Sequence, residues 1–385
     1  MEQPKKIMYV HRSLATMGGV ERVLIDKMNW LARNGCDVTL VTNSQGQHPM
    51  AFPLDERVRH LDTDTRFFLL YKHSPLVRLW KHWQLLKRYR QRLQEIVDDL
   101  QPDVIITTTY QISTCGVILD LKTAAKRIAE SHCAKFATNI ENKWHRIPVL
   151  RWLVAIQDRY YSRRVGKFDK LVVLTQGDAA EWRPYAPHIA VIPNPVTRRP
   201  ETIPQRDGSG RRIICVGRLA SQKGFDRLID AFALIADQCP EWSIDIFGNG
   251  PDREMLLSRI VAKHLEGRIR INAATPRIFD EYQQSEFYVM SSRYEGLPLV
   301  LIEAMSCGLP CVSFRCRYGA EDLITEGETG LLVPDGDIQA LADRILWMAE
   351  HTDERLRMGR NARQSSAQYT QDSIMPMWLK LFEEE

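Results

Sequence analysis

Short runs of consecutive apolar residues recur along the chain, and stretches with helical periodicity separate them. The first run, residues 7–10, leads into a loop with Gly18 and Gly19, a helical pattern over 23–31 and a second run at 38–41. Residues 213–247 repeat this order: Ile213 and Ile244 are 31 positions apart, as are Ile7 and Val38. Continuous apolar runs are typical of strands buried on both faces. Each half is therefore predicted to open with a β-loop-α-β unit of a parallel sheet.

Further runs predict more strands, and the longer periodic stretches predict helices. The strands are expected at 104–106, 171–174, 189–192, 287–290, 311–314 and 331–333, with a weaker candidate at 269–271, and helices at 80–99, 299–306 and 338–350. The segment 194–210 is rich in Pro, Gly and charge and predicts a linker. We expect an α/β protein with two Rossmann-like, doubly wound domains facing each other across a cleft. Ligands of such sheets bind beyond the carboxyl ends of the strands.

Composition is that of an ordinary soluble protein: 385 residues, 44% hydrophobic and 26% charged. This excludes disordered, collagen-like and disulfide-scaffold classes, and the length favours two domains. The longest charge-free runs, 38–54 and 104–119, contain polar residues, so no membrane span is predicted. The N-terminus lacks an apolar signal region, which together with scattered cysteines predicts a cytoplasmic location. Cys307, Cys311 and Cys316 allow a zinc site, but buried thiols around a Gly-Pro turn are favoured.

The net charge of +4 conceals an asymmetry between the halves. Residues 1–199 hold 31 Lys and Arg against 19 Asp and Glu, whereas residues 200–385 hold 21 against 29. The two halves are therefore expected to meet different partners.

Neither of the common nucleotide-binding fingerprints is present. The patterns GxGxxG and GxxxxGK[ST] are both missing, which argues against hydride transfer and P-loop hydrolysis. The loop from Gly217 to Gly224 instead carries Arg218 and Lys223 directly after a predicted strand. Two cations beside glycines make a plausible pyrophosphate clamp, and a solvated loop with two incidental cations is the alternative.

A second candidate segment, 294–303, follows the predicted strand 287–290. Gly296 suits a tight turn and Pro298 suits the first turn of a helix. The backbone N–H groups of Gly296, Leu297 and Leu299 would be free to hold an anion. Glu303 is an acid in an otherwise apolar helix, and a sugar diol or a structural ion pair would satisfy it.

Six motifs in order resemble those of the family-4 retaining glycosyltransferases of GT-B fold (glycosyl transferases group 1). The resemblance runs along nearly the whole chain, although any one motif is weak. The motifs are Gly18-Gly19-Val20-Glu21-Arg22, Val191-Ile192-Pro193-Asn194, Gly217-Arg218-Leu219 with Lys223-Gly224, Phe247-Gly248-Asn249-Gly250-Pro251, Glu295 with Glu303 eight positions later, and Gly330-Leu331-Leu332-Val333-Pro334.

The resemblance implies a role for each matching position, with residues 1–199 as the acceptor-side domain, helix 370–385 packing back on it, and 200–369 as the donor domain. Arg218 and Lys223 would hold the diphosphate of a UDP- or GDP-linked sugar. Glu303 would bind the ribose hydroxyls, and Glu295 the donor sugar. The segment Gly296–Leu299, which includes Leu297 and Pro298, would hold sugar and phosphate through its free backbone N–H groups.

Other implied donor contacts are Asn249 and the loop with Gly18 and Gly19, and His132 would lie beside the reacting sugar. A lone histidine can equally be structural. The family needs no metal or cofactor, and the acceptor hydroxyl attacks the face from which the phosphate leaves. The family's usual Gly-aromatic turn after 269–271 is here Asn272-Ala273-Ala274, which leaves the choice of base open.

The basic half also suggests an acceptor environment. Residues 65–94 contain eight Lys and Arg and no acid, interleaved with aromatic and aliphatic residues, and 143–170 contains eight against two acids. Such a pattern is typical of a helix on an anionic membrane, although a solvated helix face gives it too. A peripheral position on the inner face of the plasma membrane would fit a lipid-linked acceptor. No nucleic-acid-binding motif accompanies the charge.

The sequence therefore predicts a transferase that builds a lipid-linked or cell-surface glycan such as lipopolysaccharide, capsule or exopolysaccharide. A sugar-nucleotide epimerase and a non-catalytic partner protein of the same fold are the alternatives. The paired Glu295 and Glu303 argue against the first. The intact set of Arg218, Lys223 and both glutamates argues against the second.

Overall fold

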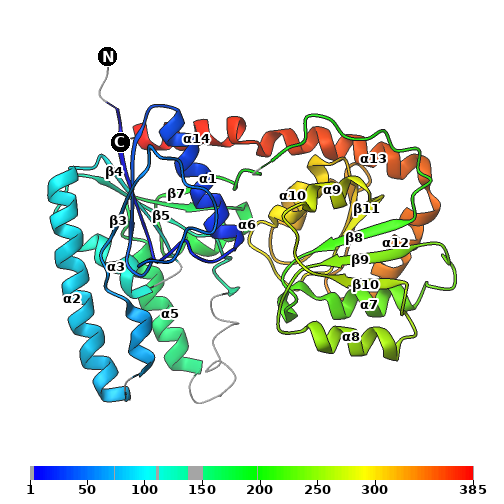
Figure 1. Cartoon of the computed structure of the whole chain (residues 1–385), viewed down its shortest axis with the longest axis horizontal. Coiled ribbons are helices and arrows are strands. Elements are labelled where there is room, and N and C mark those ends of the chain that lie inside the picture. Colours follow the sequence, from blue (N-terminus) through cyan, green and yellow to red (C-terminus); the bar gives the residue numbers. More distant parts are fainter. Residues whose placement is uncertain (1–3, 73, 110–111, 138–150, 197, 385) are drawn as a thin grey trace. The chain divides into compact units, whose positions relative to one another are not determined.

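The chain divides into two compact units, Met1–Thr197 with Ile374–Glu385, and Arg198–Ser373. The computed structural model describes residues 4–72, 74–109, 112–137, 151–196 and 198–384. Within these residues each unit contains one parallel sheet with helices between its strands (Figure 1). The predicted α/β class with two doubly wound sheets is confirmed.

The first unit has a sheet of seven described strands in the order β3-β2-β1-β4-β5-β6-β7. Its elements are β1 (Lys6–His11), α1 (Gly19–Arg33), β2 (Asp37–Thr42), β3 (Arg59–Asp62), the 3-10 helix η1 (Phe67–Lys72), α2 (Pro75–Leu100), β4 (Val104–Thr108), α3 (Ile112–Leu119), β5 (Lys126–Glu130), α5 (Arg151–Val165), β6 (Lys170–Val173), α6 (Gln176–Trp182) and β7 (Ile189–Val191). The helix α14 (Gln371–Glu383) ends the chain.

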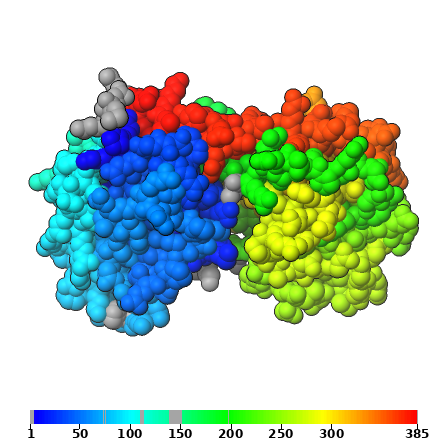
Figure 2. All heavy atoms as spheres, turned by 45° about the horizontal axis from the view of Figure 1, so that its top comes forward, coloured from blue at the N-terminus to red at the C-terminus, as the bar shows by residue number. Residues whose placement is uncertain are grey.

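Alternate residues of the central strands enter two separate cores on opposite faces of this sheet. In β1, Ile7 and Tyr9 belong to one cluster, and Met8 and Val10 to the other. This alternation explains why the strand reads as a continuous apolar run. Residues of α1 and α14 complete the first cluster, and Figure 2 shows α14 (red) against the blue N-terminal part of the same unit.

Two strands of this sheet, β3 and β5, were not predicted from the sequence. In β5 (Lys126–Glu130) only Ile128 and Ala129 are apolar, and β3 (Arg59–Asp62) has a single apolar residue. The polar ends of β5 are satisfied by tertiary contacts: Lys126 Nζ donates to Leu381 O at 2.7 Å. Periodicity cannot reveal such a strand, because its stability comes from pairing with β4 and β6.

The second unit has six described strands in the order β10-β9-β8-β11-β12-β13. Its elements are β8 (Arg212–Val216), the 3-10 helix η4 (Ser221–Lys223), α7 (Phe225–Ala233), β9 (Ser243–Phe247), α8 (Arg253–Ala262), β10 (Ile269–Asn272), α9 (Ile278–Gln283), β11 (Phe287–Met290), α10 (Leu299–Ser306), β12 (Cys311–Phe314), α11 (Ala320–Leu323), β13 (Gly330–Val333), α12 (Ile338–Glu350), α13 (Thr352–Ser365) and η5 (Ser366–Tyr369). Helices α7 and α8 cover one face of this sheet, and α9 and α10 cover the other (Figure 1).

In both units the first strand lies inside the sheet. Strand β1 lies between β2 and β4, and β8 lies between β9 and β11. The chain leaves these strands toward opposite faces at this point, which opens a crevice at their carboxyl ends. In the second unit, Arg218 and Lys223 lie on the loop after β8, and Glu295 lies on the loop after β11.

Candidate functional site

The loops after β8 and β11 are joined by several hydrogen bonds at the switch point of the second sheet. Arg293 N donates to Gln222 O at 2.8 Å, and Ser291 Oγ donates to Lys223 O at 3.1 Å. The two candidate segments, far apart in sequence, thus form one surface because their strands are neighbours.

Lys223 and Glu295 form an ion pair on this surface. The distance from Lys223 Nζ to Glu295 Oε1 is 2.7 Å, and Ser292 Oγ donates to the same carboxylate oxygen at 2.6 Å. The Lys223 side chain is 18% exposed and that of Glu295 is 7% exposed. The ammonium is therefore preorganised at the mouth of the site and still open to solvent.

Three glycines allow these loops to approach each other. Gly224 has φ +62, and a Cβ there would lie 2.1 Å from Ser291 O. A Cβ on Gly248 would lie 1.9 Å from Gly217 O, and one on Gly250 would lie 2.2 Å from Leu219 O. The loop after β9 packs directly on the loop after β8, where Leu219 N donates to Asn249 O at 2.9 Å.

The segment from Gly296 to Leu299 leads into α10. In the described part of the chain, no backbone carbonyl accepts a hydrogen bond from the N–H groups of Gly296, Leu297 or Leu299. These donors, at the start of an eight-residue helix, are available to an anionic or polar ligand. Pro298 occupies the N-cap position with extended backbone.

Glu303 lies one turn into α10 and is partly buried. Tyr282 Oη lies 3.2 Å from Glu303 Oε2 and 3.3 Å from Val300 O. Burial, followed by the charge of Glu303, raises the pKa of Tyr282 well above its usual value, so the phenol keeps its proton and donates. The carboxylate thus accepts a hydrogen bond from a neutral donor.

Arg218 and Asn249 are exposed on the same loops. The side chain of Arg218 forms no ion pair with any described residue. Asn249 Oδ1 accepts a weak hydrogen bond from Ala274 N at 3.4 Å. Ala274 belongs to the unusual turn 272–274, where Asn272 is anchored to Asp245 by a 3.3 Å hydrogen bond.

In the first unit, His132 follows β5 and lies in a buried polar cluster. Its Nε2 is 2.9 Å from Glu130 Oε2, and its Nδ1 is 3.4 Å from Asn194 Nδ2. The other carboxylate oxygen, Glu130 Oε1, accepts from Lys27 Nζ at 2.8 Å. His132 therefore lies beside a carboxylate that a buried ammonium holds in place.

His11, at the end of β1, belongs to the same cluster. Its Nδ1 lies 3.0 Å from Thr108 Oγ1 at the end of the neighbouring strand β4. Burial first, and then the nearby His132, lower the pKa of His11 to about 4, and Glu130 only partly opposes them. His11 is therefore neutral at pH 7.

Burial opposes the charge on Glu130, but Lys27 and His132 outweigh it, and the pKa of Glu130 lies well below its usual value. Burial lowers the pKa of Lys27, which Glu130 partly restores.

The structure thus brings together Arg218, Lys223, Asn249, Glu295, Gly296–Leu299 and Glu303 within the second unit. His132, with Gly18 and Gly19 at the start of α1, belongs to the first. Sequence reasoning missed Lys27, Glu130 and His11 as members of the cluster. The burial of Lys27 could have been predicted from the sequence, because its spacing from Val23, Leu24 and Leu31 places it on the apolar face of α1.

Cys307, Cys311 and Cys316 are buried. Burial raises the pKa of the Cys307 thiol to about 11 and that of Cys316 to about 12. None of the described helices combines the length and apolar character needed to cross a bilayer.

Comparison with protein families gives two matches that follow the two units. The model described as Glycosyltransferase Family 4 matches residues 17–198, and the model described as Glycosyl transferases group 1 matches residues 201–365. The chain belongs to the group 1 glycosyltransferases of family 4 type.

This glycosyltransferase is 28% identical over 379 residues to an uncharacterized glycosyltransferase of Haemophilus influenzae, covering 97% of this chain and 99% of that one. It is 33% identical over 167 residues to the amylovoran biosynthesis glycosyltransferase AmsD of Erwinia amylovora, covering 43% of this chain and 46% of that protein. It thus spans less than half of that relative.

Solved structures share its GT-B fold at low identity. TarM of Staphylococcus aureus, in complex with fondaparinux, alpha-GlcNAc-glycerol and UDP, matches with a TM-score of 0.77 and 16% identity, over 99% of this glycosyltransferase and 100% of TarM. HepE of Anabaena, in complex with UDP and glucose, matches with a TM-score of 0.73 and 18% identity, over 99% and 100% of the two chains.

Proposed function

We propose that the protein transfers a sugar from a nucleoside diphosphate sugar to a hydroxyl group of a cell-surface or lipid-linked glycan, with retention of configuration and without a metal ion. The observation that carries this is the Lys223–Glu295 pair at 2.7 Å, beside the exposed Arg218 at the switch point of the second sheet. An anion that enters there meets two cations and three unused backbone donors.

Lys223 and Arg218 are proposed to neutralise the charge that develops on the leaving diphosphate. Lys223 is partly exposed, so its ammonium can turn from Glu295 to a phosphate oxygen. Glu295 would remain held by Ser292 and could then accept a hydrogen bond from a donor-sugar hydroxyl. These two cations would supply the positive charge that a metal ion supplies in other transferases.

In the proposed reaction the bond between the anomeric carbon and the phosphate oxygen breaks while the acceptor oxygen bonds to that carbon from the same face. The leaving phosphate takes the acceptor's proton, which balances the charges without an enzymic nucleophile. Glu303 is assigned to the ribose hydroxyls, because an ionised carboxylate offers several acceptor positions and the hydrogen bond from neutral Tyr282 occupies one of them. The first unit is assigned the acceptor and His132.

The kind of acceptor is proposed from the relatives. AmsD is named for amylovoran biosynthesis, and a Staphylococcus aureus relative, 25% identical over 228 residues, is named a poly(ribitol-phosphate) alpha-N-acetylglucosaminyltransferase. Both names describe surface glycans. UDP is the first nucleotide to test, because TarM and HepE were solved with it.

The test is a thermal-shift panel of UDP, GDP and ADP with and without EDTA, on the wild-type protein, Arg218→Ala and the control Arg360→Ala. Arg360 is also an exposed arginine of the second unit, on α13. We expect one nucleotide to raise the melting temperature in EDTA, with the rise lost in Arg218→Ala and kept in the control. No shift with any nucleotide, or a shift that needs a metal, would contradict the proposal. The anomeric configuration of the product, read by NMR, tests retention.

A further inference from the structure

The first turns of α2 are rich in large apolar residues and exposed on every side. All five residues from Leu76 to Trp80 are exposed, including Leu76 at 84% and Leu79 at 70%. The same helix packs on its domain only further along, through buried Tyr89, Leu93 and Val97 at four-residue spacing. The second half of α2 is thus an ordinary amphipathic helix, and the first half projects beyond the domain it belongs to.

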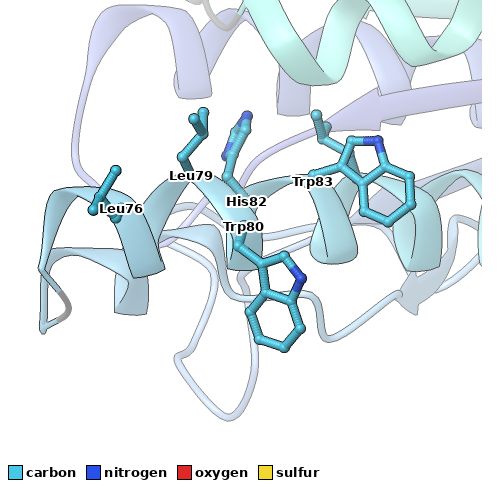
Figure 3. Close-up of a pocket in the computed structure, with 6 residues that line it drawn as sticks. Leu76, Leu79, Trp80, His82 and Trp83 are labelled. Carbon is cyan, nitrogen blue, oxygen red and sulfur yellow. The ribbon is translucent and has the colours of Figure 1, made fainter.

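Side chains of this projecting part form a shallow apolar hollow. Figure 3 shows the indole rings of Trp80 and Trp83 standing away from the helix axis, with Leu76 and Leu79 on the preceding turns. The hollow is lined by Leu76, Leu79, Trp80, His82, Trp83 and Leu86. Leu76, Leu79, Trp80 and Trp83 belong to neither of the core clusters found among the described residues of this unit.

Besides α2, the 3-10 helix η1 and the first turns of α5 also expose large apolar side chains. Figure 1 shows the starts of α2 and α5 projecting past the sheet on one side. Among the described residues, twelve of the seventeen exposed large hydrophobic side chains lie in these segments: Phe68, Leu69, Tyr71, Leu76, Val77, Leu79, Trp80, Trp83, Trp152, Leu153, Ile156 and Tyr160. We call residues 67–72 and 74–83, together with 152–160, the apolar tip.

Cations lie beside the apolar tip. Lys72 Nζ is 5.9 Å from the centre of the Tyr71 ring, and Lys87 Nζ is 6.0 Å from that of Trp83. Residues 65–94 contain eight Lys and Arg and no acid, and one of these cations, Arg66, is paired with Asp64 just outside the segment. Of the second basic segment, 143–150 lies outside the described residues, and the described part adds four exposed cations: Arg151, Arg159, Arg163 and Lys167.

We propose that the apolar tip inserts into the interfacial region of an anionic lipid bilayer and holds the N-terminal unit on its surface. Indole and phenol rings partition to the boundary between head groups and acyl chains, and Lys and Arg bind the anionic head groups. Exposed leucine and tryptophan side chains that are interspersed with exposed Arg78 and Lys87 suit the boundary between acyl chains and anionic head groups.

A second copy of the chain is the competing occupant, and charge argues against it. A two-fold contact places the same patch against itself, so each Lys and Arg of one tip would face the cations of the other. A bilayer rich in anionic lipid has the opposite sign.

The inference rests on the proposed function in one respect, that the acceptor is lipid-linked. Attachment of the N-terminal unit would then place the acceptor-binding unit at the surface where a lipid-linked acceptor resides. Vesicle binding itself is measured without donor or acceptor, so its failure and failure of the transferase activity are separate results.

The experiment is flotation of the full-length protein with vesicles of phosphatidylcholine alone and with about 40% phosphatidylglycerol, at 50 mM and 500 mM salt. The test variant is Trp80→Ser with Trp83→Ser, and the charge variant is Lys72→Glu with Lys87→Glu. The matched control is Met255→Ser with Val261→Ser, which removes exposed apolar side chains (45% and 54%) from α8 of the other unit. All three should keep the wild-type melting temperature, because the altered side chains are exposed.

We expect the wild-type protein and the α8 control to float with the anionic vesicles at 50 mM salt, with binding falling at least tenfold in both tip variants. High salt should weaken the binding, because screening shortens the reach of the surface charge. Absence of binding to anionic vesicles, or equal binding to both vesicle types, would overturn the proposal. So would a wild-type dimer in light scattering that becomes monomeric in Trp80→Ser with Trp83→Ser, which would identify a second copy as the occupant.

Discussion

Lys27 and Glu130 form an ion pair in the interior of the N-terminal unit. Their Nζ and Oε1 atoms are 2.8 Å apart, and the side chains are 1% and 2% exposed. Lys27 Nζ also lies 3.4 Å from the centre of the Trp378 ring on α14. Helix α14 therefore covers the pair whose carboxylate lies beside His132.

Removing one partner of this pair should cost far more than removing a surface partner. Glu130→Gln leaves a buried ammonium without its counter-charge, and we expect the free energy of unfolding to fall by about 3–5 kcal/mol. Glu241→Gln removes a partner of Arg211 that is 76% exposed, and it should cost less than about 1 kcal/mol. Urea unfolding checks both. Equal costs would show that the buried pair is not held as described.

Stability at mildly acidic pH should depend on His11. Its pKa of about 4 in the folded unit lies below its usual value of 6.5, so between these values the unfolded chain binds more protons. The folded state should therefore lose stability as the pH falls from 6.5 to 4, by up to about 3 kcal/mol from this residue. In His11→Gln the loss over this pH range should be smaller by that amount. Parallel curves of unfolding free energy against pH for the two proteins would contradict the assignment.

Lys223 should be needed for turnover more than for folding. In Lys223→Gln the leaving diphosphate loses one of two cations, and we expect kcat to fall about 10²–10³-fold. The melting temperature should change little, since the lysine side chain is partly exposed. The control Lys263→Gln alters a lysine with 45% side-chain exposure at the end of α8 and should leave kcat unchanged. A large drop in melting temperature with unchanged kcat would instead assign the Lys223–Glu295 pair a structural role.

Glu303 should bind the nucleotide rather than stabilise the fold. Glu303→Gln removes a charged acceptor, so calorimetry with UDP should give a Kd about tenfold higher or more. Tyr282→Phe removes the hydroxyl that lies 3.2 Å from this carboxylate but no proposed nucleotide contact, and its Kd should stay near the wild-type value. If Glu303→Gln lowers the melting temperature and leaves the Kd unchanged, the acid is structural.

Several features could be predicted because they depend on local pattern. The helix predicted at 299–306 is α10, and the one at 338–350 is α12, since apolar runs and caps are encoded by neighbouring residues. Most strands of both sheets were predicted from their apolar runs, which are likewise a feature of neighbouring residues. Strand β5 was missed because Lys126, Arg127 and Glu130 leave only two apolar residues, and contacts from other parts of the chain satisfy the polar ones.

The chain's sequence by itself determined two doubly wound units, the loops that carry Arg218, Lys223, Glu295 and Glu303, and a basic, aromatic N-terminal half. Only the tertiary structure decided which groups meet. It paired Lys223 with Glu295 across 72 positions and Lys27 with Glu130 across 103, and it left the start of α2 without a core to cover it. The reason is physical: periodicity reports burial one element at a time, whereas an ion pair or an uncovered surface depends on how distant elements pack.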